Sequence, residues 1–180
     1  DSTSTGFPIS ISKIYGENIH YRMSEFTKLP KPCTPTAINY DRLDAQVSTI
    51  TAHNLNVNGG KFSMTIDNAD IVEKCGADAK VSMRMDIDRQ FIQFRDIHIV
   101  DGTTDLRAPL YSMTGTTPNA YKDYCRAVRM RLKVAKGSIV SAKTISKFSL
   151  GQLDNMDFLL DIDEAEADGY VSDLNISKLK

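Results

Sequence analysis

The sequence predicts an all-β fold, in which an antiparallel meander forms a curved sheet, a sandwich or a groove with one or two short helices. Three observations predict it: apolar and polar residues alternate along most of the chain, glycine-containing turns separate the alternating segments, and helical periodicity is sparse. Such alternation places one face of each strand against apolar neighbours and the other in water. The 180 residues fit one all-β domain over residues 1–180, with residues 1–6 as a flexible lead-in.

The predicted strands are runs rich in β-branched and aromatic residues. The first contains Ile9 and Ile11. In the second, Val47, Thr49, Thr51, Leu55 and Val57 are assigned to one face because all have odd numbers. Further strands are predicted at residues 62–66, 81–87, 91–99 and 128–134.

The segment from Val81 to Gly102 does not alternate regularly. Its apolar residues have odd numbers up to Ile87, include Ile92 and Phe94 on the other parity, and have odd numbers again at Ile97 and Ile99. One extra residue reverses the faces of a strand. We therefore expect a turn or bulge near Asp88–Gln90, and a hairpin or strongly bent strand.

Turn sequences separate these strands. Asn58-Gly59-Gly60 is a strong hairpin signal, and Asp101-Gly102 and Asp168-Gly169 mark further turns. Leu29–Thr36 contains three prolines, which predicts an extended loop or edge segment. Thr103–Tyr121 is predicted to be the longest irregular segment, and long loops are often functional.

Helical periodicity is limited to two places. Tyr121, Tyr124 and Val128 are three and four residues apart, which predicts a short helix within Asn119–Leu132. A second helical turn is expected within Leu150–Leu160. Neither segment is long, so both are expected to be accessory to the sheet.

Charge and hydropathy exclude several classes of protein. The formal net charge is −1, whereas proteins that bind nucleic acid carry a clear basic excess. No apolar run approaches the roughly 18 to 20 residues of a transmembrane helix. Because the sequence starts at Asp1 rather than Met, we expect a processed protein that is secreted or belongs to the cell envelope.

The three cysteines are Cys33, Cys75 and Cys125. They allow one disulfide, of which a clamp between the loops around Cys75 and Cys125 is one form. Three buried thiols are the alternative, and the sequence leaves both open. No two cysteines form a Cys-x-x-Cys pair, so we expect no zinc site.

No set of residues predicts catalysis, and we expect neither an enzyme nor a cofactor. His20, His53 and His98 are far apart in sequence, and His98 lies at a polar strand position. The chain lacks Gly-x-Ser-x-Gly and phosphate-binding motifs. The acidic segment Asp161–Asp173 departs from calcium-loop spacing, so it is interpreted as a solvated strand and turn.

Methionine and phenylalanine side chains on the predicted strand faces are the main candidates for binding. Flexible thioethers adapt to varied apolar partners, although such residues more commonly fill a closed core. The opposite arrangement occurs at Arg129, Arg131 and Lys133, which share a strand face suited to solvent or to anionic head groups. The candidate ligand-binding residues are Phe62, Met64, Met83, Met85, Phe91, Met130 and Leu132.

Two functions follow from these observations. The first is a non-enzymatic exported binding module that holds a lipid or another apolar small molecule on a curved sheet. The alternative is a structural or interaction protein at a surface or in an assembly, which contacts a protein or glycan through loops such as residues 103–121. The first requires an apolar face that stays open, and the second requires a closed core.

Overall fold

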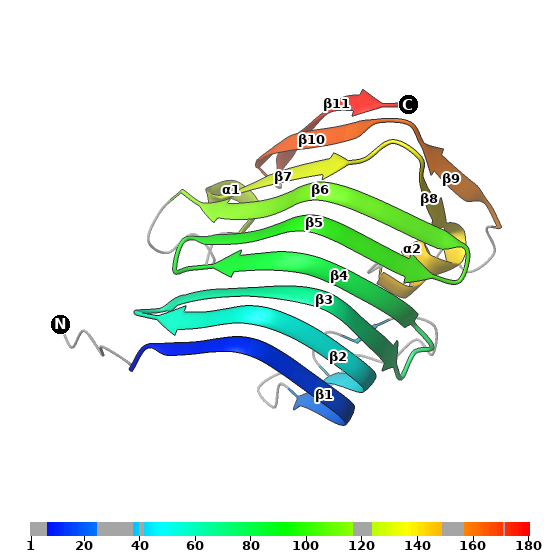
Figure 1. Cartoon of the computed structure of the whole chain (residues 1–180). Coiled ribbons are helices and arrows are strands. Elements are labelled where there is room, and N and C mark those ends of the chain that lie inside the picture. Colours follow the sequence, from blue (N-terminus) through cyan, green and yellow to red (C-terminus); the bar gives the residue numbers. More distant parts are fainter. Residues whose placement is uncertain (1–6, 25–37, 40–41, 117–123, 149–156, 171) are drawn as a thin grey trace.

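The computed structural model describes residues 7–24, 38–39, 42–116, 124–148, 157–170 and 172–180, and its strands form one antiparallel sheet (Figure 1). Neighbouring strands follow the order β1-β2-β3-β4-β5-β6-β7-β10-β11, and β8 and β9 branch from β6. The elements are β1 (Ile9–Ser24), β2 (Arg42–Asn58), β3 (Lys61–Glu73), β4 (Asp78–Ile87), β5 (Phe91–Asp101), β6 (Thr104–Gly115), α1 (Tyr124–Ala127), β7 (Val128–Val134), β8 (Ser138–Ser141), α2 (Ala142–Phe148), β9 (Leu159–Ile162), β10 (Ala165–Tyr170) and β11 (Asp173–Leu179).

Short turns join strands β2 to β6, and the sequence predicts those between β2 and β3, between β4 and β5, and between β5 and β6. Gly59 and Gly60 connect β2 to β3 with φ of 57° and 82°, the left-handed conformation that a two-residue hairpin turn requires. Between β4 and β5, the Asp88 carboxylate accepts hydrogen bonds from the amides of Gln90 and Phe91, at 2.7 and 3.0 Å. The predicted hairpin in Val81–Gly102 is therefore confirmed.

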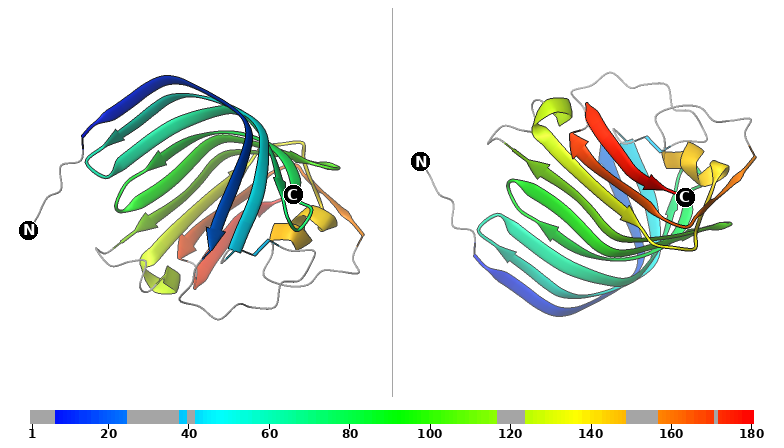
Figure 2. Two further views of the ribbon diagram at one scale, coloured as in Figure 1. Left: turned by 90° about the horizontal axis from the view of Figure 1, so that it is seen from below. Right: turned by 90° about the horizontal axis from the view of Figure 1, so that it is seen from above.

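The long strands bend in their middle because β-bulges interrupt the ladders (Figure 2). Asn18, Asn54 and Asp96 have φ of 53°, 55° and 52°. Asn and Asp adopt this left-handed conformation more readily than other residues with a side chain. A bulge leaves one residue unpaired and bends its strand, so Asn54 and Asp96, which lie at register shifts, help to produce the curvature of the sheet.

The bulges also keep apolar side chains on one face, because each extra residue changes the spacing from two to three. In β3, Ile66 pairs with Met83 and Ala69 pairs with Val81, although Ile66 and Ala69 have opposite parity. Met83 and Val81 lie two residues apart in β4, so all four side chains share a face. We call this side of the sheet the apolar face and the other side the polar face.

The apolar face has no second layer of sheet among the described residues, which form one open curved sheet. Nine of their hydrophobic residues are buried, and six of these are alanine. The larger ones are Ile97, Val128 and Ile162. A closed sandwich of this size would instead bury many Leu, Ile and Phe side chains.

Helix α2 covers one end of the apolar face, on the concave side of the sheet (Figure 2). The Ser141 hydroxyl accepts a hydrogen bond of 3.2 Å from the Thr144 amide, which caps the first turn. Lys147 Nζ lies 3.1 and 3.2 Å from the two carboxylate oxygens of Asp101 in β5. Thr104 Oγ1 completes the cluster at 2.8 Å from Thr144 Oγ1. Polar contacts therefore hold α2 to the β5–β6 hairpin.

The all-β prediction is confirmed, whereas several local predictions are wrong. Most of the predicted loop Thr103–Tyr121 is strand β6, which accommodates Pro109 opposite the unpaired Asp96. Asp168-Gly169 lies inside β10, and a side chain at Gly169 would meet the β11 backbone at Asp173. A helix follows β8, at Ala142–Phe148, where the sequence predicts none.

Other predictions have a simpler outcome. Helix α1 lies within the segment where a short helix is predicted. In β2, bulges place Thr49 and Thr51 on the polar face, so they do not share a face with Val47 as predicted. The proline-rich segment 29–36, the lead-in 1–6 and most of the predicted turn in 150–160 lie outside the described residues.

Candidate functional site

The candidate site is the part of the apolar face near the β2–β3 and β4–β5 turns, where two rows of opposed side chains cross the sheet. Each residue of a row pairs with the next across neighbouring strands, so their side chains leave the sheet on the same side. One row crosses β2 to β7 and the other crosses β3 to β7. The first contains Val57, Phe62, Ile87, Ile92, Met113 and Met130, and the second Met64, Met85, Phe94, Tyr111 and Leu132.

These side chains are accessible, because all of them are only partly buried. The rings of Phe94 and Tyr111 stack with their centroids 6.1 Å apart and their planes inclined by 14°. Such stacking fixes two flat apolar surfaces beside flexible methionines. The chemistry of this surface suits contact with an apolar molecule.

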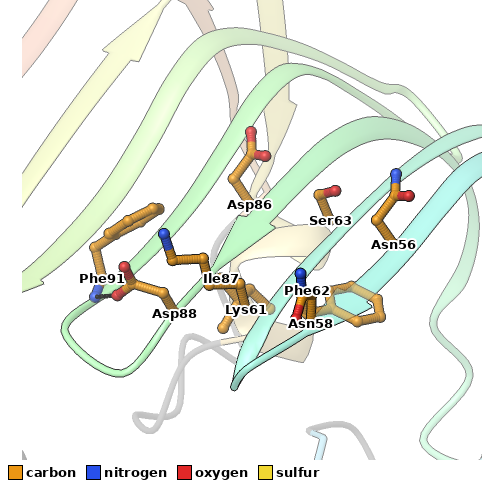
Figure 3. A pocket seen from close by; sticks show the side chains of 9 residues that line it. All are labelled: Asn56, Asn58, Lys61, Phe62, Ser63, Asp86, Ile87, Asp88 and Phe91. Carbon is orange, nitrogen blue, oxygen red and sulfur yellow. Dashed lines mark hydrogen bonds between the residues drawn. The ribbon is translucent and has the colours of Figure 1, made fainter. Parts of the chain in front are cut away.

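The structure brings six of the seven predicted ligand-binding residues onto the apolar face: Phe62, Met64, Met83, Met85, Met130 and Leu132. Phe91 is placed elsewhere. It pairs with Thr114, next to the row that contains Ile92, and therefore lies on the polar face. Near two hairpin turns it lines a hollow with polar residues such as Lys61 and Asp86 and with Phe62 and Ile87 of the first row (Figure 3).

Sequence reasoning missed other members of the site. Phe94, Tyr111 and Met113 were not selected, because the parity change around Asp96 and the loop assigned to residues 103–121 concealed their faces. The available signal was the three-residue step from Phe94 to Ile97. Such a step between two alternating runs, with Asp or Asn inside it, indicates a bulge.

The polar face carries ion pairs between neighbouring strands. Arg129 Nε lies 2.9 Å from Asp168, and Lys133 Nζ lies 3.3 Å from Glu166. The hydrogen bond from Arg129 lowers the pKa of Asp168, and the one from Lys133 lowers the pKa of Glu166. The predicted basic stripe therefore pairs with acidic residues of β10, which also accounts for part of the acidic segment Asp161–Asp173.

Each histidine contacts an aspartate on the polar face. The ring nitrogens of His20, His53 and His98 lie 2.6, 2.9 and 2.8 Å from carboxylate oxygens of Asp44, Asp67 and Asp105, respectively. The bond to His20 lowers the pKa of Asp44, and bonds from Arg107 and then His98 lower that of Asp105. In the described chain no nucleophile joins these pairs, and no cluster of His, Cys, Asp and Glu suited to a metal ion is present.

Cys75 is a free thiol in the turn between β3 and β4. Burial raises its pKa to about 11, with a further contribution from its hydrogen bond with Glu73. A disulfide with Cys125 is therefore not formed. Cys33 and the side chain of Cys125 lie outside the described residues.

Cys75 should react slowly with alkylating reagents in the folded protein. With a pKa of about 11, roughly one thiol in a thousand is ionised at pH 8, and the thiolate is the reactive form. We expect alkylation by iodoacetamide at pH 8 to be about a hundredfold slower than in urea, as measured by peptide mass spectrometry. Equal rates in the two conditions would contradict the burial of this thiol.

Comparison with protein-family models, with curated proteins and with solved structures finds no match. In the part of the chain that the structure describes, no helix is sufficiently long and apolar to cross a membrane.

Proposed function

We propose that the protein is a non-enzymatic binding module that holds a lipid or another elongated apolar molecule on the apolar face. One observation carries the proposal: two apolar rows cross the sheet without interruption, and their side chains are only partly buried. Contiguous exposed apolar surface on a soluble domain is typical of binding sites. Its area also provides a driving force of about 25 cal/mol per Å² on burial.

The composition of the surface favours a flexible apolar ligand over a flat aromatic one. Met64, Met85, Met113 and Met130 surround the stacked pair Phe94–Tyr111. Unbranched thioethers adjust to chains that differ in length and unsaturation. We propose a place in the cell envelope or outside the cell, where a carrier keeps acyl chains from water.

Lipid analysis tests this proposal directly. The whole protein is purified from cells without detergent, extracted with organic solvent and analysed by mass spectrometry. We expect lipid at a ratio close to one per chain. A clean extract, together with no uptake of a fluorescent fatty acid, would contradict the carrier and favour the interaction protein.

A pair of adjacent substitutions separates binding from stability. Met85→Asp places a carboxylate within the second row, whereas Arg84→Asp places it one residue away on the polar face. We expect Met85→Asp to weaken binding of a fluorescent fatty acid about tenfold or more, because it removes apolar contact and introduces charge. Arg84→Asp should bind within twofold of the unsubstituted protein, and equal losses in both variants would locate the ligand elsewhere.

A further inference from the structure

The edge strand β1 is long, and the apolar side chains along its outer edge have no neighbouring strand among the described residues. Its 16 residues pair with β2 on one side, and the other side has no neighbour among the described strands. Ile9, Ile19 and Tyr21 lie on the apolar face and are 51%, 42% and 50% exposed. An open edge of this length and hydrophobicity is a template for another strand.

The apolar positions of β1 from Ile9 to Tyr21 are symmetric about Tyr15. Pairing with β2 places seven residues on the apolar face, at spacings of two, three, two, three, two and two. A side chain at Gly16 would meet those of Ile19 and Ile50, which agrees with this placement. The seven are Ile9, Ile11, Ile14, Gly16, Ile19, Tyr21 and Met23.

We propose that β1 pairs with β1 of a second copy of this chain, antiparallel, with Tyr15 opposite Tyr15. In this register Ile11 meets Ile19 and Ile14 meets Gly16, so each apolar residue from Ile9 to Tyr21 faces an apolar residue or glycine. Met23 falls opposite Phe7, which precedes the strand. A shift of two residues in either direction would place charged or polar residues opposite apolar ones, because the spacing of three breaks the alternation. The pattern therefore specifies one register and a two-fold interface.

The charges on the polar side of β1 fit the same register. Lys13 of each copy lies opposite Glu17 of the other, which gives two cross-strand pairs of opposite charge. In the single chain, Glu17 accepts a hydrogen bond from Tyr15, so its carboxylate already lies along this side of the strand. The dimer extends the apolar face of one copy into that of the other.

The opposite edge lacks this symmetry. Strand β11 has seven residues, and its exposed apolar residues are Leu174, Ile176 and Leu179. Antiparallel pairing of β11 with itself has no register that places all three opposite one another, because their spacings are two and three. The pairing of β1 with itself is therefore favoured, and it does not depend on the proposed ligand.

Charge reversal tests this interface in the whole protein. The test is to determine the molecular mass by sedimentation equilibrium for the unsubstituted chain, for Lys13→Glu, for Glu17→Lys and for the double variant. The unsubstituted chain should be a concentration-dependent dimer. Each single reversal creates two like-charge pairs and should weaken dimerisation about tenfold or more, and the double variant should restore it.

The exposed substitution Asn175→Lys on β11 is the matched control and should leave the dimer unchanged. Circular dichroism confirms that each variant is folded. If the unsubstituted chain stays monomeric at all concentrations up to about 100 μM, the dissociation constant of any dimer is weaker than that, and the proposal is overturned. A dimer that Asn175→Lys weakens instead would also overturn it, as would mass that grows beyond the dimer as expected for β1 pairing with β11.

Discussion

Replacing Asp101 with leucine should lower the free energy of unfolding by about 3 to 5 kcal/mol, the cost expected when one partner of a buried ion pair is removed. Asp101 is 4% exposed, and its carboxylate accepts hydrogen bonds from Lys147 Nζ and the Thr144 hydroxyl. Without the carboxylate, the Lys147 ammonium loses its counter-ion while 79% of its side chain remains shielded from water, since 21% is exposed. Urea denaturation followed by circular dichroism measures the change.

The double variant Asp101→Leu/Lys147→Met distinguishes loss of the pair from loss of packing. Replacing both charged partners with apolar residues is often close to neutral. We expect the double variant to recover most of the stability lost by Asp101→Leu. A double variant as unstable as the sum of the two single ones would show that Asp101 and Lys147 act independently and that the pair does not hold α2.

Deletion of Asp96 should destabilise the protein by about 3 to 6 kcal/mol, because two large side chains would leave the apolar face and each is worth about 1.5 to 3 kcal/mol. The bulge at Asp96 allows Phe94 and Ile97 to share a face with the odd-numbered residues of β4. Removing one residue restores simple alternation and turns Ile97 and Ile99 toward the polar face. Urea denaturation of the deletion variant measures the loss.

The variant Asp96→Gly is the control for this deletion. Glycine adopts the φ of 52° found at Asp96 without a steric penalty, so the bulge should persist and stability should stay within about 1 kcal/mol. If the deletion variant were as stable as Asp96→Gly, the bulge would not be needed to align the apolar face.

Alternation along the chain was sufficient to predict the class of fold and most of the strands. The residues from Val81 to Ile87 alternate regularly and form most of strand β4. The Gly59-Gly60 turn connects β2 to β3, which are both predicted from the sequence. Local side-chain periodicity is a direct consequence of strand geometry, so it survives in any antiparallel sheet. The identity of the neighbouring strands followed from short hairpins.

The bulges were harder to predict, and they decide which residues form the site. Asn54 and Asp96 are ordinary polar residues in sequence, and their left-handed conformation depends on the strands beside them. Thr49 and Thr51 were assigned to the wrong face for this reason. Helix α2 also depends on tertiary contacts, because its seven residues are too few for a stable isolated helix and the buried pair with Asp101 holds it.

Whether the apolar face stays open could not follow from the sequence alone. The same Met and Phe positions would suit the core of a sandwich, and only the topology shows a single open sheet among the described strands. Phe91 illustrates the remaining ambiguity, since it adjoins the turn where parity is reset and lies on the polar face.

Photo-crosslinking tests the central claim, that the apolar face binds an apolar molecule, most directly. A fatty acid with a diazirine in the middle of its chain is bound to the protein, irradiated and mapped by peptide mass spectrometry. We predict adducts on residues of the two rows, such as Met85, Phe94 and Met113, that an excess of unlabelled fatty acid suppresses. Adducts concentrated on the polar face, or none above the level seen with competitor, would contradict the proposed function.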